Sequence, residues 1–290
     1  MASAEKRTTD DTITNVIIKY FLGMAKKILW FSCGVTSAVA CKIAIEQYGK
    51  ENCLLAYIGI RSANNDNERF IRECEKWYDA NIDTFTSIKY KDQYEVIEHT
   101  KYVNGVAGAR CTLELKKKVR QTIEENTDYD GEVFGFEFSK KEINRAVRFE
   151  QQYPHTKPIF PLIEKRLSKA ECLGILEKAG IQRPKMYALG YHNNNCIGCV
   201  KGGKGYWNKI RVDFPDHFER MKNLEIMVGR SCIKGKFLND LQPDEGRHET
   251  EIIPDCGTFC EIEFAHIIDK RTEEILNSFE KTEAGGQKNI

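Results

Sequence analysis

The first two-thirds of the chain alternates between short apolar runs and longer stretches with helical spacing of the apolar positions. Segment 53–60 is apolar almost throughout, which is typical of a central strand in a parallel sheet. Segment 37–48 instead repeats its apolar positions with a helical period and ends at a glycine. The pattern predicts strands at 27–31, 53–60, 82–88, 132–136 and 158–162. It predicts helices at 37–48, 67–78, 112–124 and 168–179, and another that continues through Arg148.

The order of these elements predicts an α/β fold with a parallel, Rossmann-like sheet covered by helices on both faces. From about Tyr191 the composition shifts toward Gly, Asn, Cys and aromatic residues, which favours a Cys-rich, loop-dominated C-terminal module. We therefore expect an N-terminal extension at 1–23, a nucleotide-binding core at 24–190, the Cys-rich module at 191–271 and a flexible polar tail at 272–290.

Composition narrows the class of protein. A net charge of +1 provides no overall electrostatic field to attract nucleic acid, although it does not exclude a local basic patch. No apolar run reaches the roughly 18 residues of a membrane span, so no membrane partner is expected. The eleven cysteines occur without a secretory signal pattern, which favours reduced thiols or a metal site over disulfides. We expect a cytoplasmic protein.

A loop of small residues joins the first predicted strand to the first predicted helix. Such a turn exposes backbone N–H groups at the positive end of a helix dipole, which suits a phosphate. The sequence lacks the Gly-Lys-Ser/Thr signature of a Walker A loop. The alternative is a plain turn with a Ser or Thr cap. The candidate phosphate-binding residues are Ser32, Cys33, Gly34, Val35, Thr36 and Ser37.

Two cysteine patterns suggest a metal centre. Cys111 follows Arg110 at the start of a predicted helix, where the dipole and the guanidinium favour a thiolate. Cys196 and Cys199 form a Cys-x-x-Cys pair, which allows two thiolates to bind one centre. Iron–sulfur, zinc, a redox dithiol and unliganded thiols are the alternatives. Cysteines within helical or strand patterns are assigned to packing: Cys41, Cys53, Cys74 and Cys172.

Basic residues near these motifs are candidates for binding phosphate or sulfate. Lys116 follows Cys111 on a basic helix, whereas Lys117 and Lys118 fit a solvated face better. After the fourth predicted strand, Gly135 precedes a helix that carries Arg145 and Arg148. An arginine there can bind an oxyanion through two hydrogen bonds. Pairing within the helix explains Arg148 equally well, and Arg145 less well.

Taken in order, these motifs resemble the PP-loop ATP-pyrophosphatase superfamily, whose adenine nucleotide alpha hydrolase-like core grips pyrophosphate with a Ser-Gly-Gly-x-Asp-Ser loop. Here Cys33 replaces the first glycine and Thr36 the usual charged residue. The branch that this chain resembles most is phosphoadenosine phosphosulfate reductase, in its phage or mobile-element form. The resemblance covers about 26–264. It implies that Lys116 and Arg145 act on the substrate, and that Gly135 belongs to the nucleotide site.

The resemblance also implies a cofactor and partners. Cys111, Cys196 and Cys199 would bind a four-iron cluster, with Cys260 as fourth ligand and Cys232 or Cys256 as alternatives. Asp255-Cys256-Gly257 is similar to the tail that carries the reductase nucleophile, which makes Cys256 a catalytic candidate. An open iron that binds sulfide is a further alternative.

Three functions remain open at this stage. A reductase would use phosphoadenosine phosphosulfate and a thioredoxin-like partner. A thiolation enzyme would use ATP with Mg²⁺ and modify a nucleic acid or a small molecule. A non-catalytic nucleotide sensor would use the metal as a structural staple. All three require that 32–37, 111 and 196–199 converge around one pocket.

Overall fold

The computed structural model describes residues 27–104 and 108–247. The expected extension at 1–23, the tail at 272–290, and the candidate residues Cys256 and Cys260 lie outside the described residues. No helix within the described ranges is long and apolar enough to cross a membrane.

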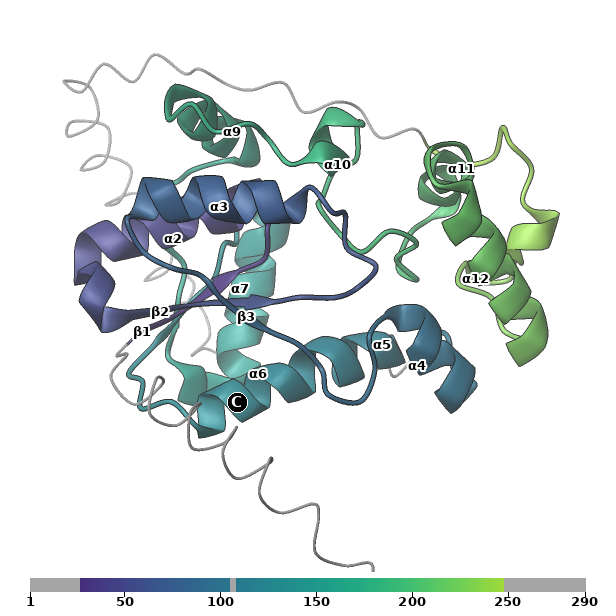
Figure 1. Cartoon of the computed structure of the whole chain (residues 1–290), viewed down its shortest axis with the longest axis horizontal. Helices are drawn as coiled ribbons and strands as arrows, with labels where there is room; N and C mark the ends of the chain where they lie inside the picture. The colour runs from purple at the N-terminus through teal and green to yellow at the C-terminus, as the bar shows by residue number, and fades with distance from the viewer. Residues whose placement is uncertain (1–26, 105–107, 248–290) are drawn as a thin grey trace, which may run out of the picture.

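A five-stranded sheet forms the centre of the molecule (Figure 1). Its order is β3-β2-β1-β4-β5 and every neighbouring pair is parallel, so the α/β architecture expected from the sequence is confirmed. Strand β1 pairs with β2 from Lys27 opposite Cys53 to Phe31 opposite Tyr57. The strands are β1 (Lys27–Phe31), β2 (Cys53–Ile58), β3 (Asp83–Phe85), β4 (Glu132–Val133) and β5 (Pro158–Ile159).

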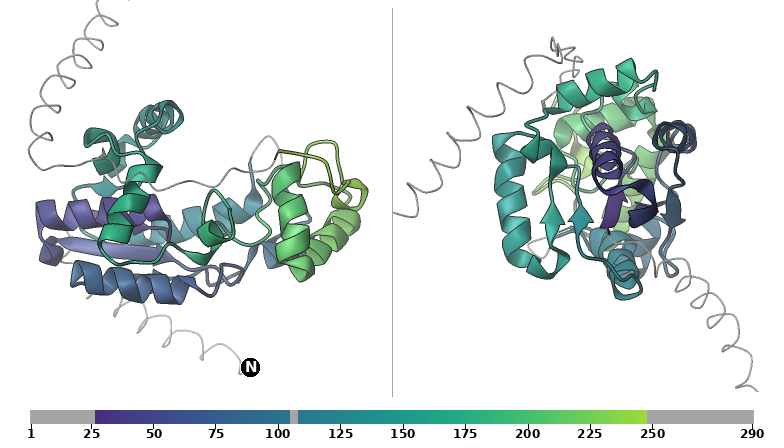
Figure 2. Two further views of the ribbon diagram at one scale, coloured as in Figure 1. Left: turned by 90° about the horizontal axis from the view of Figure 1, so that it is seen from above. Right: turned by 90° about the vertical axis from the view of Figure 1, so that its left-hand side faces the viewer.

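Helices cover both faces of the sheet. Successive residues of a strand point to opposite faces, so each face presents side chains against which helices can pack. Leu29 and Phe31 of β1 enter the largest apolar cluster, together with helices on one face. Ile28 packs with Ile123 on the other face. The first face carries α2 (Val35–Tyr48), α3 (Asn67–Tyr78) and α9 (Lys169–Lys178). The second carries α6 (Lys118–Glu125), and α7 (Lys140–Gln152) packs beside β4 (Figure 2).

Beyond residue 190 the described chain has long loops, as expected, but it also contains two regular helices that the sequence pattern did not predict. The chain forms α11 (Lys204–Asp213) and α12 (Pro215–Val228), which lie at one end of the molecule (Figure 2). Their buried residues recur three apart, as in Trp207 and Ile210. The surrounding glycines and charged residues hid this narrow apolar stripe. Both helices join one core with α4 (Gln93–Thr100) and α10 (Lys185–Ala188).

Several shorter elements complete the fold. The predicted helix at 112–124 is a continuous helical segment that contains a π-helical turn, in the order α5 (Arg110–Thr112), η2 (Leu113–Lys117) and α6. The remaining elements are η1 (Lys50–Asn52), η3 (Pro154–Thr156), α8 (Pro161–Glu164) and η4 (Leu238–Asp240).

Candidate functional site

One hydroxyl group holds together the loop that follows β1. The buried Ser37 Oγ accepts hydrogen bonds from the backbone N–H of Ser32 at 3.0 Å and of Gly34 at 3.3 Å. It also donates to Gly34 O at 2.9 Å. Cys33 has a φ of 55°, in the left-handed region that side chains other than glycine rarely adopt. Because α2 begins immediately afterwards, its first N–H groups face the strand end without partners in the helix.

The six residues of the loop differ in whether their side chains are buried in the core or line a hollow. Val35 and Cys33 are fully buried in the main core, so their side chains do not face a ligand. The Val35 N–H lies beside the hydroxyl of Tyr187. Ser32 is exposed, and Thr36 is half-buried at the rim. Of the six candidates, Ser32, Gly34, Thr36 and Ser37 line an open hollow.

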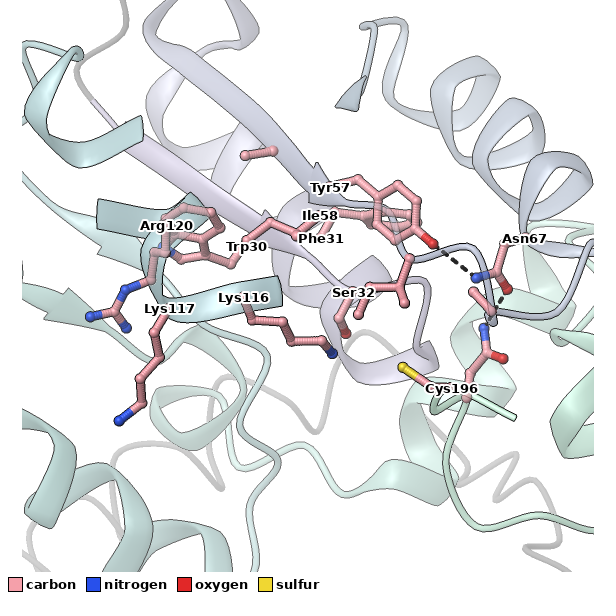
Figure 3. A pocket seen from close by; sticks show the side chains of 14 residues that line it. Trp30, Phe31, Ser32, Tyr57, Ile58, Asn67, Lys116, Lys117, Arg120 and Cys196 are labelled. Carbon is pink, nitrogen blue, oxygen red and sulfur yellow. Dashed lines mark hydrogen bonds between the residues drawn. The ribbon is translucent and has the colours of Figure 1, made fainter. Parts of the chain in front are cut away.

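Two hollows meet at this loop. The strand-end hollow, about 220 Å³, lies over the ends of β1 and β2 (Figure 3). The loop hollow, about 510 Å³, lies between the loop, segment 134–137 and α7, and falls within the size range of small-molecule sites. Their shared lining residues are Trp30, Ser32, Lys116 and Asn194. They occupy the point where the strand order reverses between β1 and β4, which is where open α/β sheets bind ligands.

Lys116 projects into the junction of the two hollows. It sits in the π-helical turn η2, a feature that often marks functional sites. Its ammonium makes no hydrogen bond or ion pair with the described residues, whereas Arg110 and Lys118 both pair with the buried Glu114 at 2.7 Å. Figure 3 shows Lys116 extending toward Ser32, while Lys117 points elsewhere. Lys116 is therefore the cation of this helix best placed to meet an anionic ligand.

Further cations line the loop hollow. Arg145 stacks over the ring of Phe136 at 4.2 Å from its centroid and pairs with Glu142 at 3.0 Å. Lys141 and Lys169 line the same hollow, and Lys169 lies 3.7 Å from Glu137. Arg148 is exposed, and its Nε donates to Asn144 O within its own helix. The sequence-based preference for Arg145 over Arg148 thus agrees with their positions.

Gly135 lies against the loop that follows β1. A methyl group added at residue 135 would stand 2.6 Å from the backbone N and Cα of Ser37. No real Cβ tolerates such a contact with backbone. The glycine therefore allows the chain after β4 to pass directly over the start of α2.

Cys196 lines the strand-end hollow together with Ser32 and Lys116 (Figure 3). Its sulfur faces the space toward which Lys116 extends. The predicted convergence of 32–37, Cys111 and 196–199 around one pocket is therefore met only by Ser32 and Cys196, because Cys111 and Cys199 are not among the residues that line the two hollows. The Cys199 N–H donates to the Tyr206 hydroxyl at 2.9 Å, and that hydroxyl donates to Cys196 O at 3.1 Å. Tyr206 therefore fixes the turn between the two cysteines.

The other thiols lie close by but are buried. Burial raises the pKa of Cys111 to about 11, and the neighbouring thiols of Cys199 and Cys196 add to this rise. The expected stabilisation of a Cys111 thiolate by Arg110 is therefore wrong, because Arg110 pairs with Glu114 instead. Burial also raises the pKa of Cys232, and the thiols of Cys199 and Cys111 contribute. Thiols with raised pKa values are poor nucleophiles unless a cation binds them.

Single-ion metal binding gains no geometric support. Within residues 27–104 and 108–247, no three His, Cys, Asp or Glu side chains come close enough to hold one metal ion. Of the four cysteines assigned to packing, Cys41, Cys74 and Cys172 are almost fully buried in the main core, and Cys53 is partly buried against it. The expected fourth ligand, Cys260, lies outside the described residues.

Sequence inspection missed several residues of the site. Trp30 was treated only as part of a strand, although the end of a parallel strand is where ligands bind. Tyr57 and Asn67 carried no motif. The run of three asparagines that ends at Asn195 could have indicated part of the site. Each of these amide side chains, directly before the Cys-x-x-Cys pair, carries hydrogen-bond donors and an acceptor that need partners. Asn194 lines both hollows.

Comparison with known proteins adds no assignment. No protein-family model matches the chain, and no curated protein matches it significantly.

Proposed function

We propose that the chain binds an adenine nucleotide across the two hollows and uses it for sulfur chemistry, as phosphoadenosine phosphosulfate reductases of the PP-loop superfamily do. The observation that carries this proposal is the shared wall of Ser32, Lys116 and Cys196. It brings the loop at 32–37, which we call the phosphate loop for its proposed role, into one space with a thiol and with a lysine that has no hydrogen-bond or ion-pair partner among the described residues. The strand order β3-β2-β1-β4-β5 supports a Rossmann-like nucleotide-binding core of this kind.

The lining of each hollow suggests how the nucleotide lies. The strand-end hollow is lined by Trp30, Tyr57 and Ile58, which suit a flat aromatic base. The loop hollow has Lys141, Arg145 and Lys169 in its wall, which suit phosphate or sulfate oxygens. Since the hollows share Ser32 and Lys116, the phosphates attached to the base would lie at that junction.

In the reductase version, a thiolate attacks the sulfonyl sulfur of phosphoadenosine phosphosulfate. A sulfur–sulfur bond forms, the bond to the phosphate oxygen breaks, and adenosine bisphosphate leaves with the electron pair. A dithiol of a thioredoxin-like partner then attacks the protein sulfur, releases sulfite and becomes a disulfide. Lys116 and Arg145 would neutralise the oxyanion that leaves. Cys256 is the candidate nucleophile.

A four-iron cluster fits the chemistry of the donor set better than a single zinc ion. Cys111 lies near Cys196 and Cys199, and Cys232 lies near Cys199 and Cys111, yet no three donors in the described part of the chain converge on one point. Each thiolate of a four-iron cluster binds a different iron, so its ligands spread around the cluster. Cys111, Cys196 and Cys199 would hold three irons, with Cys232 or Cys260 as the ligand of the fourth. A bound cluster would supply redox capacity beside the nucleotide.

ATP-dependent thiolation is a second candidate, favoured by the Cys196 sulfur in the wall of the strand-end hollow. In this version ATP, with Mg²⁺, transfers AMP to an oxygen of the acceptor and pyrophosphate leaves. Sulfide held at the thiol site then displaces AMP. The basic segment after Cys199 gives little support for a nucleic-acid acceptor. Lys204 pairs with Glu245 at 2.8 Å, and Arg211 donates to Leu241 O at 2.6 Å.

The test uses full-length protein purified without oxygen. Sulfite release from phosphoadenosine phosphosulfate with a thioredoxin supports the reductase, and pyrophosphate release from ATP supports thiolation. Lys116→Ala should reduce the observed activity at least tenfold, whereas Lys76→Ala, which removes an exposed lysine of α3, should not. Saturable binding without turnover would favour a nucleotide sensor. Absence of both binding and turnover would refute the proposal.

A further inference from the structure

Asn194 joins three segments that lie far apart in the sequence. Its Nδ2 donates to Cys33 O at 2.7 Å and to Asn67 Oδ1 at 2.7 Å. Asn67, at the start of α3, donates in turn from Nδ2 to the Tyr57 hydroxyl at 3.0 Å (Figure 3). The Tyr57 hydroxyl, at the end of β2, lies beside the Cys33 thiol and influences its pKa. Three hydrogen bonds thus join the four residues in a series that returns to Cys33, which we call the asparagine ring.

The ring accounts for an unusual residue in the phosphate loop. Cys33 holds a left-handed backbone, which ordinarily favours glycine. Such a conformation persists only where the surroundings hold it in place. Here the ring contacts Cys33 at two points, because its carbonyl accepts from Asn194 and its thiol lies beside the Tyr57 hydroxyl. A glycine would adopt this backbone more easily but would lose the second contact.

The ring also restrains one side of Cys196. Asn194 ties the chain to the phosphate loop two residues before this cysteine. On the other side, the Ile197 N–H donates to Ser62 O at 2.9 Å, and Gln93 Nε2 donates to Ile197 O at 2.8 Å. Cys196 therefore lies between two fixed points, one of which belongs to the phosphate loop.

One polar atom of the ring is left for a ligand. Asn194 Oδ1 is buried and has no hydrogen-bond partner among the described residues. Leaving a buried acceptor unsatisfied is unfavourable. Because Asn194 lines both hollows, a hydroxyl or amino group of a bound molecule can satisfy this oxygen.

We propose that Asn194 is a positioning residue that couples the phosphate loop to the Cys196 thiol. Through the asparagine ring, a nucleotide that orders the loop also orders the segment carrying Cys196. The functional meaning of this coupling rests on the proposed nucleotide site. The mechanical link does not, because the ring is complete without a ligand.

Hydrogen exchange of the full-length protein tests the link in the absence of nucleotide. Asn194→Ala removes two hydrogen bonds, so amides in 193–200 should exchange about tenfold faster. Tyr57→Phe keeps the ring volume and should give a smaller increase. It also serves as the test if Asn194→Ala does not fold. Asn223→Ala, at an exposed position of α12, is the control. If exchange in 193–200 is the same in both ring variants and in the control, the link is overturned.

A second arm adds ATP or phosphoadenosine phosphosulfate. In the parent protein, nucleotide should slow exchange in both 32–37 and 193–200. In Asn194→Ala it should slow exchange in 32–37 only, and protection that still spreads to 193–200 would overturn the coupling. If neither nucleotide protects 32–37 in the parent protein, the proposed function fails, while the ring is still judged by the nucleotide-free measurement.

Discussion

Trp30 Nε1 donates a 2.7 Å hydrogen bond to Oε2 of Glu132, a carboxyl group with no solvent exposure. The two residues lie on the adjacent strands β1 and β4, and the other carboxyl oxygen has no partner within the described part of the chain. Trp30 lines both hollows, so this carboxyl group lies directly behind the candidate site. Burial raises the pKa of Glu132 from 4.5 to about 7, and the nearby Glu124 adds to the rise.

This raised pKa predicts a particular pH dependence of stability. Between pH 4.5 and 7 the folded state holds a proton on Glu132 that the unfolded state releases. The contribution of the protonated Glu132 carboxyl group to folding stability is therefore complete below about pH 4.5 and is lost as the pH rises to 7. When the pH is raised from 5 to 8, the parent protein should lose roughly 1–3 kcal/mol more unfolding free energy than Glu132→Gln loses. Denaturant unfolding at several pH values measures this. A difference between the two proteins that does not vary with pH would contradict the assignment.

Gly135→Ala should disrupt the phosphate loop. The added methyl would stand 2.6 Å from the backbone of Ser37, so the loop or the 134–137 segment must move. We expect a loss of about 1–3 kcal/mol in unfolding free energy. We also expect nucleotide binding at least tenfold weaker. Gly203→Ala is a suitable control, because nothing lies within 4 Å of the added group and its φ is −83°. Equal effects of the two substitutions would argue against the close approach.

Arg145 and Arg148 form a matched pair for testing the loop hollow. Arg145 lines the hollow, and Arg148 on the same helix does not. Loss of a charge-assisted hydrogen bond predicts about tenfold or more weaker binding of nucleotide to Arg145→Ala. Arg148→Ala should bind as the parent does. Equilibrium dialysis with labelled nucleotide distinguishes them, and equal affinities would remove Arg145 from the site.

Cysteine substitutions test the proposed cluster. Iron and sulfide analysis of protein prepared without oxygen should show that Cys196→Ser lacks the cluster. Cys172→Ser should retain it, because this thiol is fully buried in the main core. Equal iron in both variants would remove Cys196 from the ligand set. Cys232→Ser and Cys260→Ser compared side by side then identify the fourth ligand, since only the true ligand should reduce iron content.

The core of the fold could be predicted from sequence because its signals are local. Strand β1 and helix α3 both have the predicted bounds, because the apolar pattern of each runs over its whole length and has clear ends. Strands β4 and β5 are only two residues each. Their predicted lengths were too long because aromatic residues that follow the strand, such as Phe134 and Phe136, pack against α7 instead of extending the sheet.

The site was predictable only in part, because much of it depends on contacts between distant segments. Ser32, Lys116 and Cys196 were recognised from motifs, and they do share a wall. The raised pKa of Cys111 could not be predicted from a motif, because it results from burial and from thiols that come from elsewhere in the chain. Asn194 likewise gains its role from hydrogen bonds to Cys33 and Asn67, which are 161 and 127 residues away, and no local pattern encodes them.

Nucleotide binding is the direct test of the central proposal. Equilibrium dialysis of the oxygen-free, full-length protein against labelled ATP and labelled phosphoadenosine phosphosulfate should reveal a single saturable site per chain for at least one of them. Lys116→Ala should weaken this binding, whereas Lys76→Ala should leave it unchanged. Failure of both nucleotides to bind the parent protein, or equal binding to both lysine variants, would contradict the proposed site.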